Sequence, residues 1–171
     1  MPSGPMNSPA AAGVSRRTFF RYFASKEDVV VQFLGDLGAG MHAGLCDRPA
    51  GERPSLALRH AVSVPLAACG DQSERALSVV QLILRTPALR ARFLERQAQW
   101  RDGLATELAR RLELGAETDL SPQLAAGMAL TAFDAVLRRW SGSDGAEDPA
   151  ALIEDAFAVI TPALDASPAA R

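Results

Sequence analysis

The sequence has few of the residue types from which metal centres, disulfide frameworks and most active sites are built. Among its 171 residues are two cysteines and two histidines. Cys46 and Cys69 lie far apart, with no histidine at a ligand-like spacing, so we expect both to be small buried apolar residues. His42 and His60 belong to no catalytic motif, and no glycine-rich phosphate loop follows a strand. We therefore expect no catalytic residue, no metal and no cofactor, and an enzyme is the least supported class of function.

Long apolar runs and an excess of one charge are also absent. No apolar run approaches the roughly 20 residues that a membrane span needs, and the N-terminal residues lack the charged flank and apolar centre of a secretory signal. We therefore expect a cytoplasmic protein with no membrane partner. The formal net charge is −2, so any nucleic-acid binding has to come from a local basic patch.

What the sequence does contain is a helical pattern with an ordinary balance of apolar and charged residues. Hydrophobic residues make up 48% and charged residues 22% of the chain, which is typical of a folded domain with a proper core. Apolar residues recur at helical spacing from Ser15 onward, and no convincing strand appears. This predicts an all-α protein. A short first helix is expected over residues 16–23. A second helix is expected to begin at a capping box, Ser25–Asp28, and to be weakened by glycines toward its end near residue 44. Further helices are expected over residues 55–68, 73–85, 88–114, 121–140 and 150–164.

One stretch, GVSRRTFFRYFASKEDVV at residues 13–30, differs from the rest. On a helical wheel its three phenylalanines lie on one side. The opposite side carries two guanidiniums, a hydroxyl and a phenol, from Arg17, Thr18, Arg21 and Tyr22. Arginine can hold guanine edges in the major groove, and hydroxyls can contact phosphates or a thymine methyl. Lys26 falls in the first turn of the next expected helix, where free amides also favour an anion. Spacing alone leaves two interpretations open, a DNA-reading face and a solvated surface.

The residues of this stretch resemble the helix-turn-helix signature of TetR-family transcriptional regulators. Ala12-Gly13-Val14-Ser15 is similar to the family's turn, the run from Thr18 to Phe23 to its recognition helix, and Ser25-Lys26-Glu27 to the opening of its fourth helix. The resemblance covers roughly residues 10–30. It implies a homodimeric repressor that binds a pseudo-palindromic operator and leaves it when a small molecule enters the helical core. The groove-facing and phosphate-facing positions that it implies are Arg16, Arg17, Thr18, Arg21, Tyr22 and Lys26.

The chain departs from the family pattern before the recognition helix. TetR-type DNA-binding domains use three helices, of which the recognition helix is the third. Here only residues 9–12 could represent the end of the second helix, and the first helix is expected to be absent. Phe19, Phe20 and Phe23 would lose packing surface, which forfeits on the order of 1.5–3 kcal/mol per exposed side chain. Two explanations stay open. In the favoured one, residues encoded upstream of Met1 complete the domain. In the alternative, the chain is a dimeric helical ligand-binding or interaction protein that has lost DNA binding.

The resemblance also predicts how the chain is divided. Residues 1–9, which hold three prolines, are expected to form a disordered tail. Residues 10–30 would be a partial helix-turn-helix, and residues 31–166 a helical ligand-binding and dimerisation domain. The last two helices, rich in small residues such as Ala129, Ala132 and Ala135, resemble the pair that forms a four-helix dimer interface.

The ligand implied for this domain is a small apolar or amphipathic molecule of unknown identity. An apolar wall with a few polar handles would suit it. The candidate lining residues are Met41, His60, Phe93, Gln97 and Trp100. The same spacing of leucine, phenylalanine and tryptophan is also typical of an ordinary helical core, and the sequence leaves both interpretations open.

Overall fold

The computed structural model describes residues 16–71, 73–114 and 119–166, and within these ranges every regular element is a helix. The helices are α1 (Arg16–Cys46), α2 (Pro54–Asp71), α3 (Ser73–Arg85), α4 (Pro87–Arg111), α5 (Ser121–Gly142) and α6 (Pro149–Leu164). The all-α prediction is confirmed, and α2 to α6 begin and end within a few residues of the expected positions. The tail expected at residues 1–9 lies outside the described residues, and the division at residue 30 stays a prediction.

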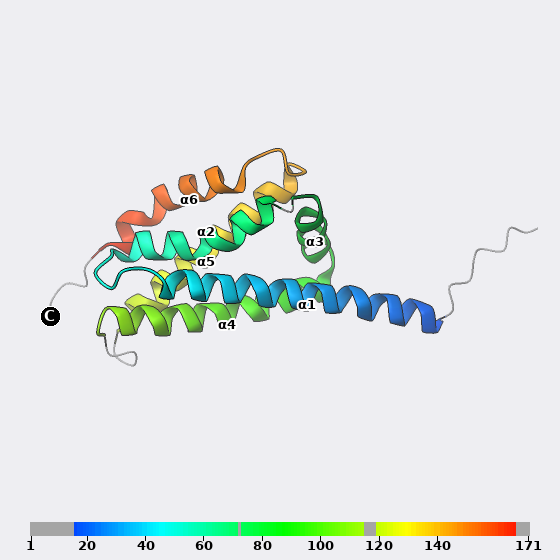
Figure 1. Cartoon of the computed structure of the whole chain (residues 1–171), viewed down its shortest axis with the longest axis horizontal. Helices are drawn as coiled ribbons and strands as arrows, with labels where there is room; N and C mark the ends of the chain where they lie inside the picture. The colour runs from blue at the N-terminus through cyan, green and yellow to red at the C-terminus, as the bar shows by residue number, and fades with distance from the viewer. Residues whose placement is uncertain (1–15, 72, 115–118, 167–171) are drawn as a thin grey trace, which may run out of the picture.

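The two longest helices, α1 and α4, lie side by side and run in the same direction (Figure 1). α2 packs against α1 and turns the chain back, α6 packs on α2 and α5, and α3 closes one end against α4. The N-terminal turns of α1 extend beyond the end of the other helices (Figure 1). This places the beginning of α1 outside the bundle and the rest of it within the bundle.

Local signals explain where the later helices begin. Pro87 and Pro149 each occupy the first turn of a helix, where a missing N–H costs no hydrogen bond. Asp148 caps α6, because its carboxylate accepts from the backbone N–H of Ala150 at 3.1 Å. At the other end of α6, Asp165 accepts from the backbone N–H and the hydroxyl of Ser55, at 3.0 and 2.7 Å. This pair joins the end of α6 to the beginning of α2.

The core contains the large apolar side chains that the helical periodicity placed inside. Its largest fully buried side chains include Phe93, Phe133, Trp140, Phe157, Leu34, Met41 and Leu45. Leu124 and Leu112, which helical spacing alone would place with the core residues of α5 and α4, are instead 62% and 37% exposed. Leu124 lies in the first turn of α5 on the side that faces away from the core, and Leu112 lies just beyond the end of α4.

The expected break in the first helix at Ala24-Ser25 is wrong, because α1 runs without interruption from Arg16 to Cys46. No proline or glycine occurs between Val14 and Leu34, and Ala24, Lys26 and Glu27 are all good helix formers. Ser25 is exposed, so its hydroxyl can face solvent within a helix as well as it can cap one. The capping-box pattern therefore does not stop the helix. The helix start expected at Ser15 lies outside the described residues.

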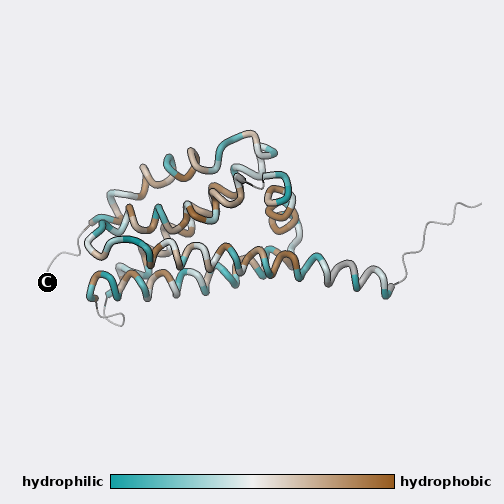
Figure 2. The backbone as a smooth tube through the Cα atoms, in the orientation of Figure 1, coloured by the Kyte–Doolittle hydropathy of each residue, from teal (hydrophilic) through white to brown (hydrophobic). Residues whose placement is uncertain are grey.

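The expectation that no apolar segment approaches the length of a membrane span is also corrected. The segment Ser25–Cys46 of α1 is long and apolar enough to cross a membrane by length and composition. A helix in the core of a bundle can have the same length and composition, so one such segment is weak evidence for a membrane span. Here one face of the segment is buried in the bundle, through Val30, Leu34, Leu37, Met41 and Leu45. Its hydrophobic colour is strongest beside α3 (Figure 2).

Two of the glycines expected to weaken α1 instead allow neighbouring helices to approach it. A Cβ atom on Gly38 would lie 2.2 Å from Nε1 of Trp100 on α4. A Cβ atom on Gly44 would lie 3.0 Å from a methyl of Val64 and 3.2 Å from the Cα atom of Ala61 on α2. Both glycines therefore mark surfaces where α1 is in close contact with another helix.

We expect Gly38→Ala to destabilise the protein by about 1–3 kcal/mol, because the added methyl group displaces the Trp100 ring. Gly35→Ala is the matched control on the same helix, since a Cβ atom there meets nothing within 4 Å. The control should gain about 0.5–1 kcal/mol from the better helix propensity of alanine. Urea unfolding measures both. Equal stabilisation by the two variants would contradict the close contact at Gly38.

Candidate functional site

The basic strip predicted for DNA lies on the part of α1 that extends from the bundle (Figure 1). Arg17, Thr18, Arg21 and Lys26 are all exposed. Arg17 and Arg21 are four residues apart on a continuous helix, so the two guanidiniums share a face. The side chains of Arg16 and Tyr22, the other two candidates, lie outside the described residues. The structure therefore places four of the six candidates, all within the first three turns of α1.

An ion pair marks where α1 meets the bundle after this strip. Arg92 of α4 lies 3.5 Å from the carboxylate of Glu27, and both side chains are at least a third exposed. Exposed pairs of this kind contribute about 0–1 kcal/mol. The buried face of α1, which begins at Val30, is therefore what holds the helix in the bundle.

The five residues predicted to line a ligand pocket do not line one cavity. Met41 and Phe93 are fully buried core residues, and His60 is exposed. Trp100 is half-buried, with its ring edge-on to Phe93 and Phe133 at centroid distances of 6.0 and 6.5 Å. Gln97 is also half-buried, and its Nε2 atom is buried with no hydrogen-bond partner among the described residues. Of the five, Gln97 is the one that reaches a large hollow.

That hollow is an open groove of about 850 Å³ between α4, α5 and α6. Apolar side chains dominate its lining, and several of them are well exposed. Leu94, Leu124 and Val159 are 50, 62 and 79% exposed. The small residues Ala132 and Ala135, expected at a helix–helix interface, also line it. The groove thus exposes apolar side chains from the same two helices that the sequence assigned to dimerisation.

A second cavity, of about 370 Å³, lies between α1, α2 and α3. Its lining residues are Val29, Gln32, Phe33, Asp36 and Leu37 from α1, Pro65, Ala68 and Cys69 from α2, and Arg75, Ala76 and Val79 from α3. Sequence reasoning did not assign these residues to a site. The available signal was a mixed face of α1, on which polar and apolar residues recur three and four positions apart.

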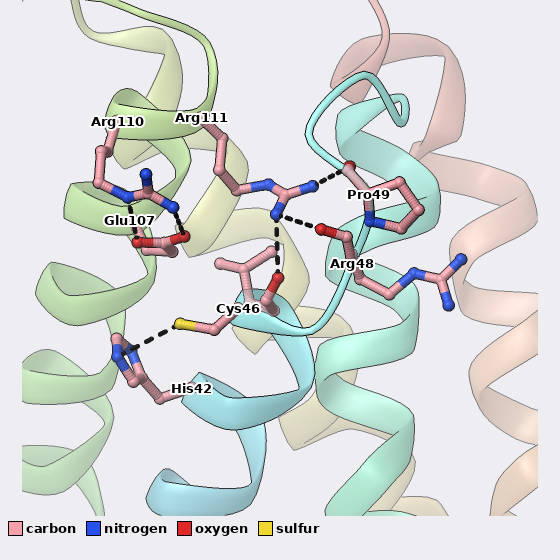
Figure 3. A network of polar contacts seen from close by, with 8 residues as sticks. His42, Cys46, Arg48, Pro49, Glu107, Arg110 and Arg111 are labelled. Atoms are coloured by element: carbon pink, nitrogen blue, oxygen red, sulfur yellow. Dashed lines mark hydrogen bonds and ion pairs between the residues drawn. The ribbon is translucent and has the colours of Figure 1, made fainter.

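A polar network fixes the C-terminal ends of α1 and α4 (Figure 3). One guanidinium nitrogen of Arg111 donates to the backbone carbonyls of Leu45 and Arg48, at 3.2 and 2.8 Å, and the other donates to the carbonyl of Pro49. These carbonyls lie at the end of α1 and in the following loop, and those of Leu45 and Pro49 also accept a backbone N–H, from Arg48 and Glu52 at 3.2 and 3.1 Å. Arg111 therefore ties the loop after α1 to the last turn of α4.

An ion pair and a thiol lie beside these hydrogen bonds of Arg111. Glu107 is buried, and its two hydrogen bonds from Arg110, at 2.9 and 2.7 Å, hold the pKa of its carboxyl group below the usual range. The Sγ atom of Cys46 lies 3.6 Å from Nε2 of His42. Cys46 is exposed, contrary to expectation, because its position is about 100° around the helix from the buried Leu45. In the described part of the chain, no three His, Cys, Asp or Glu side chains are grouped to hold a metal ion.

Cys69 is buried, as the sequence predicted. Loss of hydration raises the pKa of its thiol to about 11. The thiol is therefore neutral at physiological pH and behaves as an apolar group in the wall of the cavity between α1, α2 and α3.

Comparison with known proteins extends over both parts of the chain. Residues 10–33, which include the basic strip, match the profile of "Bacterial regulatory proteins, tetR family". Residues 52–165, from the loop before α2 to the end of α6, match the profile of the "MftR C-terminal domain". The chain belongs to the TetR family.

Two TetR-family relatives are similar over most of this chain. It is 31% identical over 136 residues to the HTH-type transcriptional regulator TcmR of Streptomyces glaucescens, covering 76% of this chain and 60% of that protein. It is 37% identical over 138 residues to the proposed mycofactocin biosynthesis transcriptional regulator MftR of Mycobacterium tuberculosis, covering 75% of this chain and 66% of that protein. The matched part thus spans about three fifths to two thirds of the relatives' length. Both relatives carry the names of transcriptional regulators.

We expect Arg111→Gln to lower the free energy of unfolding of this TetR-family chain by about 1–3 kcal/mol, because it leaves carbonyls at the end of α1 without their charged donor. Arg90→Gln is the control, since Arg90 is an exposed arginine of the same helix. It should change the stability by less than about 0.5 kcal/mol. Denaturant unfolding measures the stability of both variants. Similar small losses of stability in the two would show that the hydrogen bonds of Arg111 contribute nothing.

Proposed function

We propose that this TetR-family chain belongs to a homodimeric transcriptional repressor that binds operator DNA through the first turns of α1 and leaves it when a small ligand binds in the bundle. The observation that carries the proposal is the basic strip on the outer end of α1, inside the segment that matches the family profile. The names of the two relatives support the same class of function.

The strip has the chemistry needed for a nucleic acid even though the whole chain is slightly acidic. Arg17 and Arg21 are exposed and lie four residues apart on α1, whose N-terminal turns extend beyond the other helices (Figure 1). A helix with arginines on one face can enter a major groove and pair with guanine edges or phosphates. Each phosphate that such a side chain neutralises releases counterions, so binding through the strip should weaken as salt is raised.

The groove between α4, α5 and α6 supports a second copy of the chain as the partner. It exposes Leu94, Leu124 and Val159 together, and small residues beside them leave room for another helix. A two-fold axis through this face would bring α5 and α6 of two copies into one four-helix contact. Two strips would then be available for two half-sites of a pseudo-palindromic operator.

Ligand control is supported by the position of α1. The helix carries the basic strip at one end and five residues of the cavity between α1, α2 and α3 further along. A ligand that binds one position of α1 better than another shifts the protein toward that position. The same helix would thus link the ligand to the DNA.

We expect Arg17→Ala and Arg21→Ala each to weaken binding to a pseudo-palindromic operator near the gene by about fivefold or more, and to reduce the slope of log K against log salt by about one per lost phosphate contact. Arg90→Ala, on α4, should leave both quantities unchanged. Fluorescence anisotropy over a salt series measures them. The protein used includes any residues encoded in frame upstream of Met1.

One outcome would contradict the DNA-binding proposal. If neither the chain that begins at Met1 nor the upstream-extended protein binds any such operator, while the protein dimerises and binds a small molecule, the chain is a ligand-binding protein without a DNA-reading role. If the extended protein alone binds, the upstream residues complete the domain.

We expect the double change Leu124→Glu and Val159→Glu to convert the dimer to a monomer, because it places two buried charges in each half of the interface. Leu120→Glu is the control, since Leu120 is 76% exposed but lies outside the groove lining. Sedimentation equilibrium of the three proteins measures the association. A double variant that still dimerises as the parent does would place the interface elsewhere.

A further inference from the structure

The cavity between α1, α2 and α3 has the size and the mixed lining of a small-molecule site. Its volume of about 370 Å³ falls in the range of roughly 300–1,000 Å³ typical of ligand pockets. Three consecutive helices, α1, α2 and α3, each contribute residues to it. It shares no lining residue with the groove between α4, α5 and α6, so it stays available when that groove is occupied by a second copy.

The floor of the cavity is apolar and uncharged. Leu37, Cys69 and Ala76 are at most 5% exposed, and Phe33 and Val79 are half-buried beside them. Because burial keeps the Cys69 thiol protonated, the floor presents no charge. It offers one aromatic ring and several aliphatic groups, which suit an aryl body of modest size.

The mouth of the cavity carries two opposite charges on different helices. Arg75 lies on α3 and Asp36 on α1, and both are exposed. Neither side chain has an ion-pair or hydrogen-bond partner among residues 16–71, 73–114 and 119–166. Gln32, one turn before Asp36, adds an amide at the same mouth. An acid group can therefore reach Arg75 while a neighbouring hydrogen-bond donor reaches Asp36 or Gln32.

We infer that this cavity binds amphipathic aromatic anions, with the aryl body on the floor at Phe33 and Val79 and the acid group at Arg75. The assignment rests on the proposed function in one respect, since it names the chemical class of the ligand that controls the regulator. The presence of Asp36 across the mouth favours a single acid group with a donor beside it over a dianion, because a second negative charge would face the carboxylate.

Two fluorescent probes with the same aryl body distinguish the contribution of the apolar floor to binding from that of Arg75 at the mouth. Anilinonaphthalene sulfonate carries an acid group next to an N–H donor, and N-phenylnaphthylamine has the same rings and N–H without the acid. The fluorescence of both rises in apolar surroundings. We expect Arg75→Gln to weaken binding of the sulfonate about fivefold and to change binding of the neutral probe by less than about twofold. Arg85→Gln, an exposed arginine of the same helix outside the cavity lining, should change neither.

Filling the cavity tests the place of binding. Ala76→Leu adds volume to the floor and should weaken both probes about tenfold. Ala68→Leu also fills the cavity, from an exposed position at its edge. If the urea midpoint shows that the Ala76→Leu protein is not folded, the Ala68→Leu protein is used in its place. The inference is overturned if Arg75→Gln affects both probes equally or neither, or if the folded filling variants bind both probes as the parent does. These titrations contain no DNA, so their outcome is separate from the operator-binding test.

Discussion

The contact between Gly38 of α1 and the indole of Trp100 on α4 is the constraint on which the arrangement of the bundle depends. It sets how closely the two longest helices approach. It also orients Trp100 between Phe93 and Phe133, so that the aromatic core of α4 and α5 is packed around the same point. At the far end of the two helices Arg111 repeats the attachment with hydrogen bonds to backbone carbonyls. Packing in the middle and polar bonds at the end together fix α1 along α4.

The groove and the cavity differ in the chemistry of the residues that line them. The groove of α4, α5 and α6 is wide, open and lined mainly by apolar groups, which suits an apolar helix face of another protein molecule. The cavity of α1, α2 and α3 is smaller and combines an apolar floor with charges at its mouth, which suits a small ligand. α1 takes part in the second and not in the first. A dimer formed through the groove would therefore cover no residue of α1 or of the cavity.

The sequence predicted those features that depend on residues close together in the chain. Proline in the first turn marks the beginnings of α4 and α6, at Pro87 and Pro149, and helical spacing of apolar residues indicates the buried positions of Phe93 and Phe157. It failed where competing local signals were decided by the surrounding structure, as at Ser25, where a capping pattern lies within a continuous helix. The exposure of Cys46 and the cavity beside Cys69 depend on which neighbouring helix covers each side of α1 and α2. That information comes from helix packing, which a single sequence does not display.

The close contact at Gly38 also gives α1 a mechanical property. About twenty residues separate this contact from the arginines of the first turns, which at 1.5 Å per residue is a rigid arm of about 30 Å. With the contact as a fulcrum, a tilt of about 5° displaces the outer end by roughly 2.5 Å, close to half the 5.4 Å pitch of the helix. Gly35 and Gly38 lie at the fulcrum end of this arm, and the outer part from Arg16 to Leu34 contains no proline or glycine, so that part moves as one straight segment. A shift of a few tenths of an ångström beside the cavity is thus magnified several-fold at the basic end.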